Sequence, residues 1–312
     1  MRCATGQTCS AGSCSGGTGG GSGTVFGQCR FHFGMDHGSF RQSPQAEVDY
    51  VTAWAGSGEN FNLTQLFQDC KPGGVAAGRV PVLYSYIIAF TARRDLGLLD
   101  CNVGTPNLCQ QGAAYIRQRR NDRILPQYRK YAQGVASAWG TTSPVIWLME
   151  PDYYQYSQGP NPQPLTFQEA GDFMREIVAA VRAILPNAIF SMDISPWIAN
   201  PSQWYAAFQM SDFTFINTSG GSTDADNTRI RQANSMTWRS IHQLLNKPIL
   251  ADDGYGAAGT PTFHDPSWDS PTNLNARIAD GVVGVMQVNA PSSWSGTISS
   301  IRSQLAAPVR CP

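Results

Sequence analysis

Carboxylate side chains follow several apolar segments of this chain. The five that stand at or near such segment ends are Glu150, Asp152, Asp193, Asp252 and Asp253. A carboxyl group at the end of a hydrophobic strand has a raised pKa, because burial disfavours its charged form. Such a group can donate or accept a proton near neutral pH, so these five residues are candidates for an acid/base site.

Aromatic residues are frequent around the same positions, and the chain has 8 Trp and 11 Tyr residues. Sugar rings present apolar C–H faces that stack on indole and phenol rings, so aromatics beside carboxylates suit a glycan. We expect Trp139 and Trp147 to be core residues. The side chains that we expect to bind substrate are Asp193, Trp197, Tyr84, Tyr86, His32, Tyr153, Asn217, Tyr255 and Trp294.

His32, Asp36 and His37 are the nearest approach to a set of metal ligands. The chain has only 4 His residues, without a ligand spacing such as His-Glu-x-x-His, so we expect neither a metal nor a cofactor. Charged residues make up 14% of the chain and the formal net charge is zero, which does not favour nucleic acid. No apolar run of about 18 residues predicts a membrane span. We expect a monomer whose partner is a polysaccharide or oligosaccharide substrate.

Short apolar segments alternate with helix-like stretches from residue 25 onward. The segments that we predict as strands are 29–34, 80–90, 145–149, 187–197, 212–217, 247–256 and 281–289. Helices are predicted over 112–139, 167–185 and 227–245. The first has a predicted buried apolar stripe of Tyr115, Ile116, Ile124, Tyr128, Tyr131 and Val135, and the second has Thr166 and Glu169 as a capping box. Apolar strands that alternate with helices are typical of a parallel sheet covered by helices.

Seven or eight such units predict an α/β fold, either a (βα)8 barrel or a distorted, incomplete TIM-like barrel, as a single catalytic domain over 25–312. The C-terminal strand ends of a parallel barrel converge on one face, so the five carboxylates are expected to become neighbours. Residues 1–24 are a cysteine-containing segment followed by a Gly/Ser linker, which we expect to be disordered.

Eight cysteines without a Cys-x-x-Cys pair favour disulfides in a secreted protein, and a cytosolic protein with reduced thiols is the alternative. We expect Cys101 to pair locally with Cys109. Cys29 and Cys311 are placed to join the two ends of a closed fold.

The run Glu150-Pro151-Asp152 resembles the strand end of glycoside hydrolase family 6, a family of distorted-barrel cellulases in which the Asp is the general acid. Later segments resemble that family in order and spacing: 192–197 with Asp193 and Trp197, 215–219 with Asn217, and the strand ending in Asp252 and Asp253. This resemblance implies Asp152 as the acid and Asp252 or Asp253 as the base.

The chain also resembles the large clan of retaining (βα)8 glycoside hydrolases, with Glu150 at the end of the fourth strand as acid/base. That clan has Asn before this Glu, where this chain has Met149, and a Glu nucleophile on the seventh strand, where this chain has Asp252 and Asp253.

The function predicted first is therefore a secreted glycoside hydrolase that cleaves a β-linked, cellulose-like glucan with inversion. The two alternatives are a retaining β-glycanase with Glu150 as acid/base, and a carbohydrate-binding barrel without catalysis.

Overall fold

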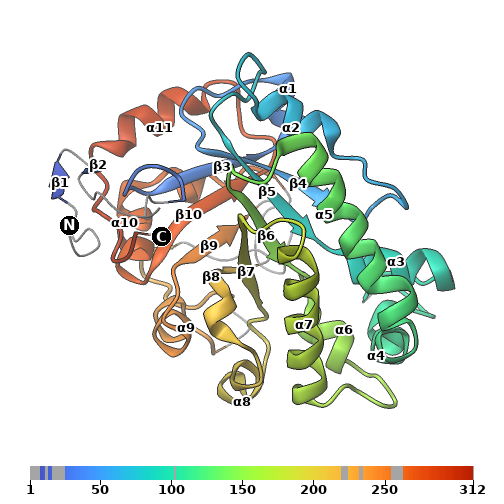
Figure 1. Ribbon diagram of the computed structural model, residues 1–312. Helices are drawn as coiled ribbons and strands as arrows, with labels where there is room; N and C mark the ends of the chain where they lie inside the picture. Colours follow the sequence, from blue (N-terminus) through green and yellow to red (C-terminus); the bar gives the residue numbers. More distant parts are fainter. Residues whose placement is uncertain are drawn as a thin grey trace. The chain divides into compact units, whose positions relative to one another are not determined.

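The computed structural model describes residues 8–10, 13–15, 25–101, 103–218, 224–231, 235–253 and 263–311. Eight parallel strands form a closed barrel in the order β10-β3-β4-β5-β6-β7-β8-β9, so that strands consecutive in sequence are neighbours and β10 returns to β3 (Figure 1). The strands are β3 (His32–Asp36), β4 (Tyr50–Ala55), β5 (Val80–Ser85), β6 (Val145–Met149), β7 (Ala188–Ile194), β8 (Phe213–Thr218), β9 (Ile249–Asp252) and β10 (Val282–Gln287). A short pair of antiparallel strands, β1 (Thr8–Ser10) and β2 (Ser13–Ser15), precedes them.

The chain divides into two compact units, and the larger number of helices belongs to the unit of Ala53–Ala77 and Pro81–Phe213. In it β6 pairs with β5 and β7, and all five residues of β6 are buried. Its helices are α2 (Thr64–Cys70), α3 (Ile87–Leu96), α4 (Leu108–Arg119), the π-helix η1 (Arg120–Ile124), α5 (Leu125–Trp139), α6 (Tyr153–Gln158), α7 (Phe167–Arg182), α8 (Pro201–Ala206) and η2 (Met210–Asp212).

The other unit consists of Met1–Thr52, Gly78–Val80 and Thr214–Pro312. Here β10 pairs with β3 on one side and β9 on the other, and Gly34 of β3 lets the Tyr50 ring lie against the backbone, since a Cβ on Gly34 would be 2.0 Å from that ring. The helices of this unit are α1 (His37–Gln42), α9 (Trp238–Leu245), η3 (Pro266–Asp269), α10 (Pro271–Ala279) and α11 (Trp294–Arg302).

The predicted strands are confirmed in place, with shifted ends, and the closed eight-stranded barrel confirms the predicted (βα)8 fold class. Three details differ from prediction. Segment 80–90 is a strand only to Ser85, because Ile87 begins α3. Strand β4 was not predicted. Within the predicted helix 227–245, the described helical part is only Trp238–Leu245.

The capping box of Thr166 and Glu169 is confirmed at the start of α7. Helix 112–139 is interrupted by the π-helical turn at Arg120–Ile124, and its predicted apolar stripe is buried on both sides of that turn. Trp147 is fully buried, whereas Trp139 is only half-buried.

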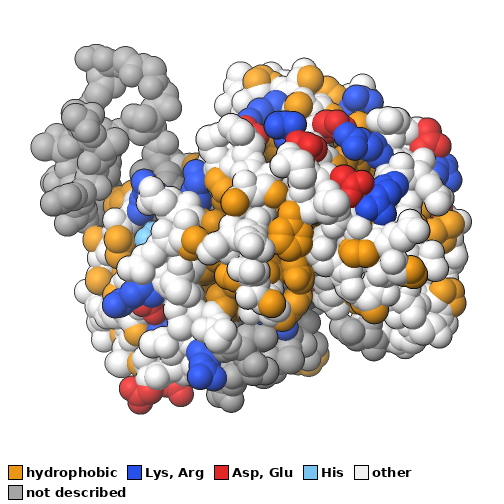
Figure 2. Space-filling model, turned by 90° about the horizontal axis from the view of Figure 1, so that it is seen from below, with side chains coloured by type: hydrophobic (Ala, Val, Ile, Leu, Met, Phe, Trp, Pro, Cys, Tyr) orange, Lys and Arg blue, Asp and Glu red, His pale blue; other side chains and the backbone are white. Residues whose placement is uncertain are grey.

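Both predicted disulfides are present, Cys29 with Cys311 and Cys101 with Cys109. None of the described helices has the length and apolar character that crossing a bilayer requires. Figure 2 shows Lys and Arg side chains lying next to Asp and Glu, with wide uncharged areas around them, as expected at zero net charge. Apart from the backbone of β1 and β2, residues 1–24 lie outside the described part of the chain, so the expectation of disorder there stays a prediction.

Candidate active site

The Glu150-Pro151-Asp152 segment forms a strained turn directly after β6, the fourth strand of the barrel. Glu150 has φ 44° and Asp152 has φ 65°, so both side chains sit on left-handed backbone. The other described non-glycine residues with positive φ are Asn246 and Asn289, and Asn tolerates this conformation well. Glu does not, and strain of this kind gathers at functional sites.

The Glu150 carboxylate is buried and fully engaged by three donors. Its side chain is 0% exposed. Oε1 accepts from the Ile88 amide at 2.8 Å and from the Tyr128 hydroxyl, and Oε2 accepts from the Tyr156 hydroxyl at 2.5 Å. Burial raises the pKa of Glu150 to about 7, although each of these hydrogen bonds acts to lower it. The group is therefore poised to change protonation near neutral pH.

Three helices supply these donors. Tyr128 lies on α5, Tyr156 on α6, and Ile88 in the first turn of α3, where backbone amides have no partner within the helix. The Tyr128 hydroxyl also accepts from Ser85 Oγ at 3.3 Å, at the end of β5. Burial, and then the charge of Glu150, raises the pKa of both tyrosines, so they remain donors over the whole physiological range.

Asp152 lies in a different environment from Glu150. It occupies the N-cap position of α6 without a capping hydrogen bond from its side chain, and it is partly exposed. Burial raises the pKa of Tyr86, and the negative charge of Asp152 is the next cause. If the strand continued, alternation would place Glu150 and Asp152 on the same side of it. The strand ends at Met149, however, and in the turn that follows Glu150 is buried whereas Asp152 is accessible.

An aromatic cluster covers the ends of β4 and β5 in the same unit. Trp54 stacks on Tyr84 with ring centroids 4.8 Å apart and an interplanar angle of 25°. Tyr86 and Phe90 meet Trp54 edge to face at 5.8 and 6.1 Å. Tyr84 and Tyr86 are buried, whereas Trp54 is only half-buried. Trp54 was not among the residues expected to bind substrate, because the strand that carries it was not predicted.

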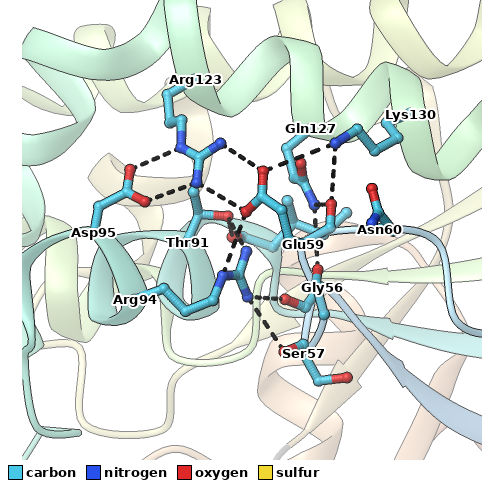
Figure 3. Close-up of polar contacts among 12 residues, drawn as sticks. Gly56, Ser57, Glu59, Asn60, Thr91, Arg94, Asp95, Arg123, Gln127 and Lys130 are labelled. Atoms are coloured by element: carbon cyan, nitrogen blue, oxygen red, sulfur yellow. Dashed lines mark hydrogen bonds and ion pairs between the residues drawn. The ribbon is translucent and has the colours of Figure 1, made fainter.

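The loop after β4 is tied to α3 and α5 by the polar network in Figure 3. Arg123 bridges Asp95 and Glu59, with N–O distances of 2.7 to 2.8 Å. Arg94 donates to the carbonyl oxygens of Gly56 and Ser57, and Lys130 donates to that of Glu59. The hydrogen bonds with Arg123 are the largest cause that lowers the pKa of Glu59 and of Asp95. These contacts anchor the loop next to Trp54 to α3 and α5.

The remaining predicted residues of this unit are mostly buried. Asp193 lies within β7 and accepts from Ser195 Oγ at 3.1 Å. Tyr153 donates its hydroxyl to the Ala170 carbonyl at 3.1 Å and does not face solvent. Trp197, in the segment after β7, is half-buried. Their role in binding substrate stays a prediction.

In the other unit, Asp252 is the last residue of β9, the seventh barrel strand, and Asp253 follows it. Both are buried, and the Asp253 amide donates to the Met286 carbonyl at 2.9 Å. Burial raises the pKa of Tyr50, with the charge of Asp252 as the next cause. Asn217, in β8, is also buried, and Tyr255 lies outside the described residues.

His32 is part of a buried ion-pair cluster. Its Nδ1 lies 3.5 Å from an Asp49 oxygen, and Asp49 also contacts Arg30 and Arg302 at 2.6 and 3.1 Å. Burial lowers the pKa of His32. Burial acts to raise the pKa of Asp49, but the contacts with His32 and the two arginines outweigh it, and that pKa is lowered.

Two further predicted residues have structural partners. Asp36 caps α1 by accepting from the Ser39 amide at 2.9 Å. Trp294 is buried and donates to Asp269 Oδ1 at 2.8 Å. Among the described residues, no three His, Cys, Asp or Glu side chains gather closely enough to hold a metal ion.

A scan against protein-family models finds no match, and neither does a search of curated proteins. Solved structures do match. Bacillus subtilis mannanase man26 has 12% identity and a TM-score of 0.51, with 93% of this chain and 90% of that chain covered. The Podospora anserina GH26-CBM35 β-(1,4)-mannanase has 11% identity and a TM-score of 0.55, with 89% and 62% covered. This chain shares their barrel fold.

A β-mannanase from a symbiotic protist of the termite Reticulitermes speratus, complexed with gluco-manno-oligosaccharide, is similar to the same extent, at 11% identity and a TM-score of 0.51. The match covers 93% of this chain and 91% of that chain. These mannanase structures and the closed eight-stranded barrel support the (βα)8 form of the fold, and they give no support to a family 6 cellulase in particular.

Proposed function

We propose that the protein is a glycoside hydrolase that acts on a β-linked polysaccharide. The observation that carries this proposal is the turn after the fourth barrel strand. It holds two carboxyl groups on left-handed backbone, one buried with a pKa raised to about 7 and one accessible beside aromatic rings. A strained backbone with a perturbed carboxyl group is typical of a catalytic site. The two disulfides fit an extracellular enzyme.

We assign proton donation to Asp152, because it is the member of the pair that solvent reaches. Glu150 has both oxygens occupied by donors and no exposed surface, so we assign it the role of positioning the turn. The second carboxyl group of the reaction is that of Asp252 or Asp253. Because these residues end the seventh strand, where the retaining clan has its nucleophile, retention is now favoured over the inversion predicted first. The assignment departs from that clan at one point, since the clan's acid/base falls at Glu150 and we place proton donation at Asp152.

Mannan is the first substrate to test, in place of the cellulose-like glucan predicted from the Glu-Pro-Asp motif. Its support is the fold shared with structures described as β-mannanases, one of them in complex with a gluco-manno-oligosaccharide. Release of reducing sugar from mannan, glucomannan, cellulose, mixed-linkage glucan and xylan ranks these substrates directly. Mannan and glucomannan are expected to be cleaved fastest.

Substitution assigns the roles. Asp152→Asn is expected to lower kcat by at least a hundredfold, because general acid catalysis contributes about 10²–10⁴ in rate. Normal turnover in Asp152→Asn, together with a collapse in Glu150→Gln, would transfer proton donation to Glu150. The anomer released first, read by proton NMR, decides between retention and inversion.

A carbohydrate-binding barrel without catalysis is the second candidate, and it is favoured by the full burial of Glu150 and Asp253. Carboxylates of this kind serve as fixed structural groups as readily as catalytic ones. Affinity for mannan oligosaccharides without release of any sugar establishes this second function.

A further inference from the structure

Trp54 lies at the end of β4 with one face covered and part of the ring still accessible. Its stacking partner, Tyr84, is only 1% exposed. One face of the Trp54 indole therefore lies against a buried ring. A partly exposed indole stacked on a buried ring is a flat apolar surface backed by a rigid support. Sugar rings bind such surfaces through their C–H faces.

The Trp54 ring is fixed from further directions. Tyr86 and Phe90 contact it edge to face and also contact each other at 5.3 Å. The Tyr86 hydroxyl donates to Asp100 Oδ1 at 3.1 Å, and Asp100 in turn pairs with Arg93 at 2.9 Å. Because the ring is already held in place, a ligand that stacks on it loses little conformational entropy of the protein.

The loop that follows Trp54 is fixed as well. Gly56 has φ 101°, and a Cβ at this position would lie 2.7 Å from the Ile87 backbone, so the loop runs tightly against the start of α3. Arg94 then binds the carbonyl oxygens of Gly56 and Ser57. These contacts anchor the loop that follows Trp54 to α3.

Tyr86 connects this platform to the proposed proton donor. The charge of Asp152 acts on Tyr86, and Tyr86 also meets the ring of Tyr156, the donor to Glu150, at 6.2 Å. The platform therefore adjoins the Glu150-Pro151-Asp152 turn within one unit of the chain. An apolar surface next to a carboxylate matches a pyranose ring, which offers C–H groups on its face and hydroxyl groups at its edge.

We propose that Trp54, supported by Tyr84, Tyr86 and Phe90, forms a subsite that stacks one sugar ring of a β-linked glycan beside Asp152. This proposal rests on the proposed function for its ligand class. It adds a residue that determines how tightly the chain of sugars is held.

The test measures binding separately from catalysis. Mannohexaose and cellohexaose are titrated by calorimetry into Asp152→Asn and into the same variant carrying Trp54→Ala. Loss of the stacking ring is expected to weaken binding of at least one of the two oligosaccharides roughly tenfold. Trp54→Phe keeps a flat ring and should retain most of the affinity, whereas Trp54→Leu keeps apolar volume alone and should behave like Trp54→Ala.

Trp139→Ala is the matched control, since Trp139 is another half-buried indole, at the end of α5, and its Nε1 donates to the Pro144 carbonyl. Affinity should be unchanged in this variant. If Trp54→Ala does not fold, the comparison of Trp54→Leu with Trp54→Phe decides the same question.

The outcomes separate this subsite from the proposed function. Sugar release with equal affinities in the Phe, Leu and wild-type forms overturns the subsite and leaves the hydrolase standing. Binding that depends on Trp54 without any sugar release supports the subsite and overturns the hydrolase. Absence of binding to both oligosaccharides in every form overturns the subsite.

Discussion

The folded protein stabilises the protonated form of the Glu150 carboxyl group. Its pKa is raised by burial to about 7 from an ordinary value of 4.5, so between these two pH values the folded protein binds more protons than the unfolded chain. The contribution of Glu150 to stability therefore falls as pH rises through this window. A difference of this size corresponds to roughly 3 kcal/mol in the free energy of unfolding.

Glu150→Gln is expected to remove the contribution of this group to the pH dependence of stability, because an amide keeps the shape without titrating. Urea unfolding at several pH values between about 2 and 7.5 measures the effect of Glu150→Gln above pH 4.5 and that of its control below pH 4.5. Glu169→Gln is the control of opposite sign. Hydrogen bonding to Arg117 lowers the pKa of Glu169 to about 2, so its contribution is lost as pH falls through the acid range. A Glu150→Gln profile with the wild-type slope would contradict the assignment.

The hydroxyls that serve Glu150 give a second prediction. Tyr128→Phe or Tyr156→Phe leaves a buried carboxylate with one donor fewer, at a cost of about 1 to 3 kcal/mol. The cost should be larger at pH 8 than at pH 6, since the missing donor matters most to the ionised group. Unfolding at the two pH values is the measurement.

Tyr153→Phe supplies the comparison for these two variants. Its hydroxyl donates to the neutral Ala170 carbonyl, so its loss should cost the same at both pH values. An equal pH dependence in all three variants would show that Tyr128 and Tyr156 do not sense the charge of Glu150.

At the scale of elements, the turn from β4 into its loop depends on glycine. Gly56→Ala combines left-handed backbone with a Cβ 2.7 Å from the Ile87 Cα, and we expect a loss of about 2 to 4 kcal/mol. Gly73 has φ 89°, and a Cβ added there would meet nothing within 4 Å, so Gly73→Ala should cost only the backbone contribution, about 1 kcal/mol. Chemical denaturation compares the two. Equal losses of stability in the two variants would show that the close approach of Gly56 to Ile87 does not matter.

The sequence pattern was sufficient to predict a strand where the side chains on both faces of the strand are apolar. Val145–Met149 is wholly buried, and its uninterrupted apolar run predicts it as a strand. Strand β4 was not predicted because Asp49 and Thr52 divide its sequence into apolar runs of only two and three residues, Tyr50-Val51 and Ala53–Ala55. In segment 80–90 the apolar pattern continues past Ser85 without a break, since the first turn of α3 is as buried as the strand before it.

The candidate site could also be predicted only in part from the sequence. The carboxylates of 150–152 stand out by type and position, and their placement after the fourth strand is confirmed. Their unequal exposure depends on the left-handed turn, which no residue type in Glu-Pro-Asp encodes. Tyr128 was predicted only as part of an apolar stripe on a helix. That its hydroxyl reaches Glu150 is decided by how α5 packs on β6, which sequence periodicity does not contain.

At the scale of the whole molecule, the charges are sparse and balanced, and the same holds on the surface drawn in Figure 2. Attraction to a polyanion is therefore not expected, and recognition must come from shape, stacking and hydrogen bonds. This agrees with a neutral polysaccharide as ligand, and it predicts binding that changes little with ionic strength.

The disulfide between Cys29 and Cys311 turns the chain from residue 29 to residue 311 into a covalent ring. A ring that is cut once remains one molecule. If a protease site is inserted in the exposed segment 159–164, Cys311 is the only cysteine on the C-terminal fragment. The cleaved protein should migrate as a single species in denaturing electrophoresis without reductant and as two fragments with it. Two fragments in both lanes would show that the ring is open.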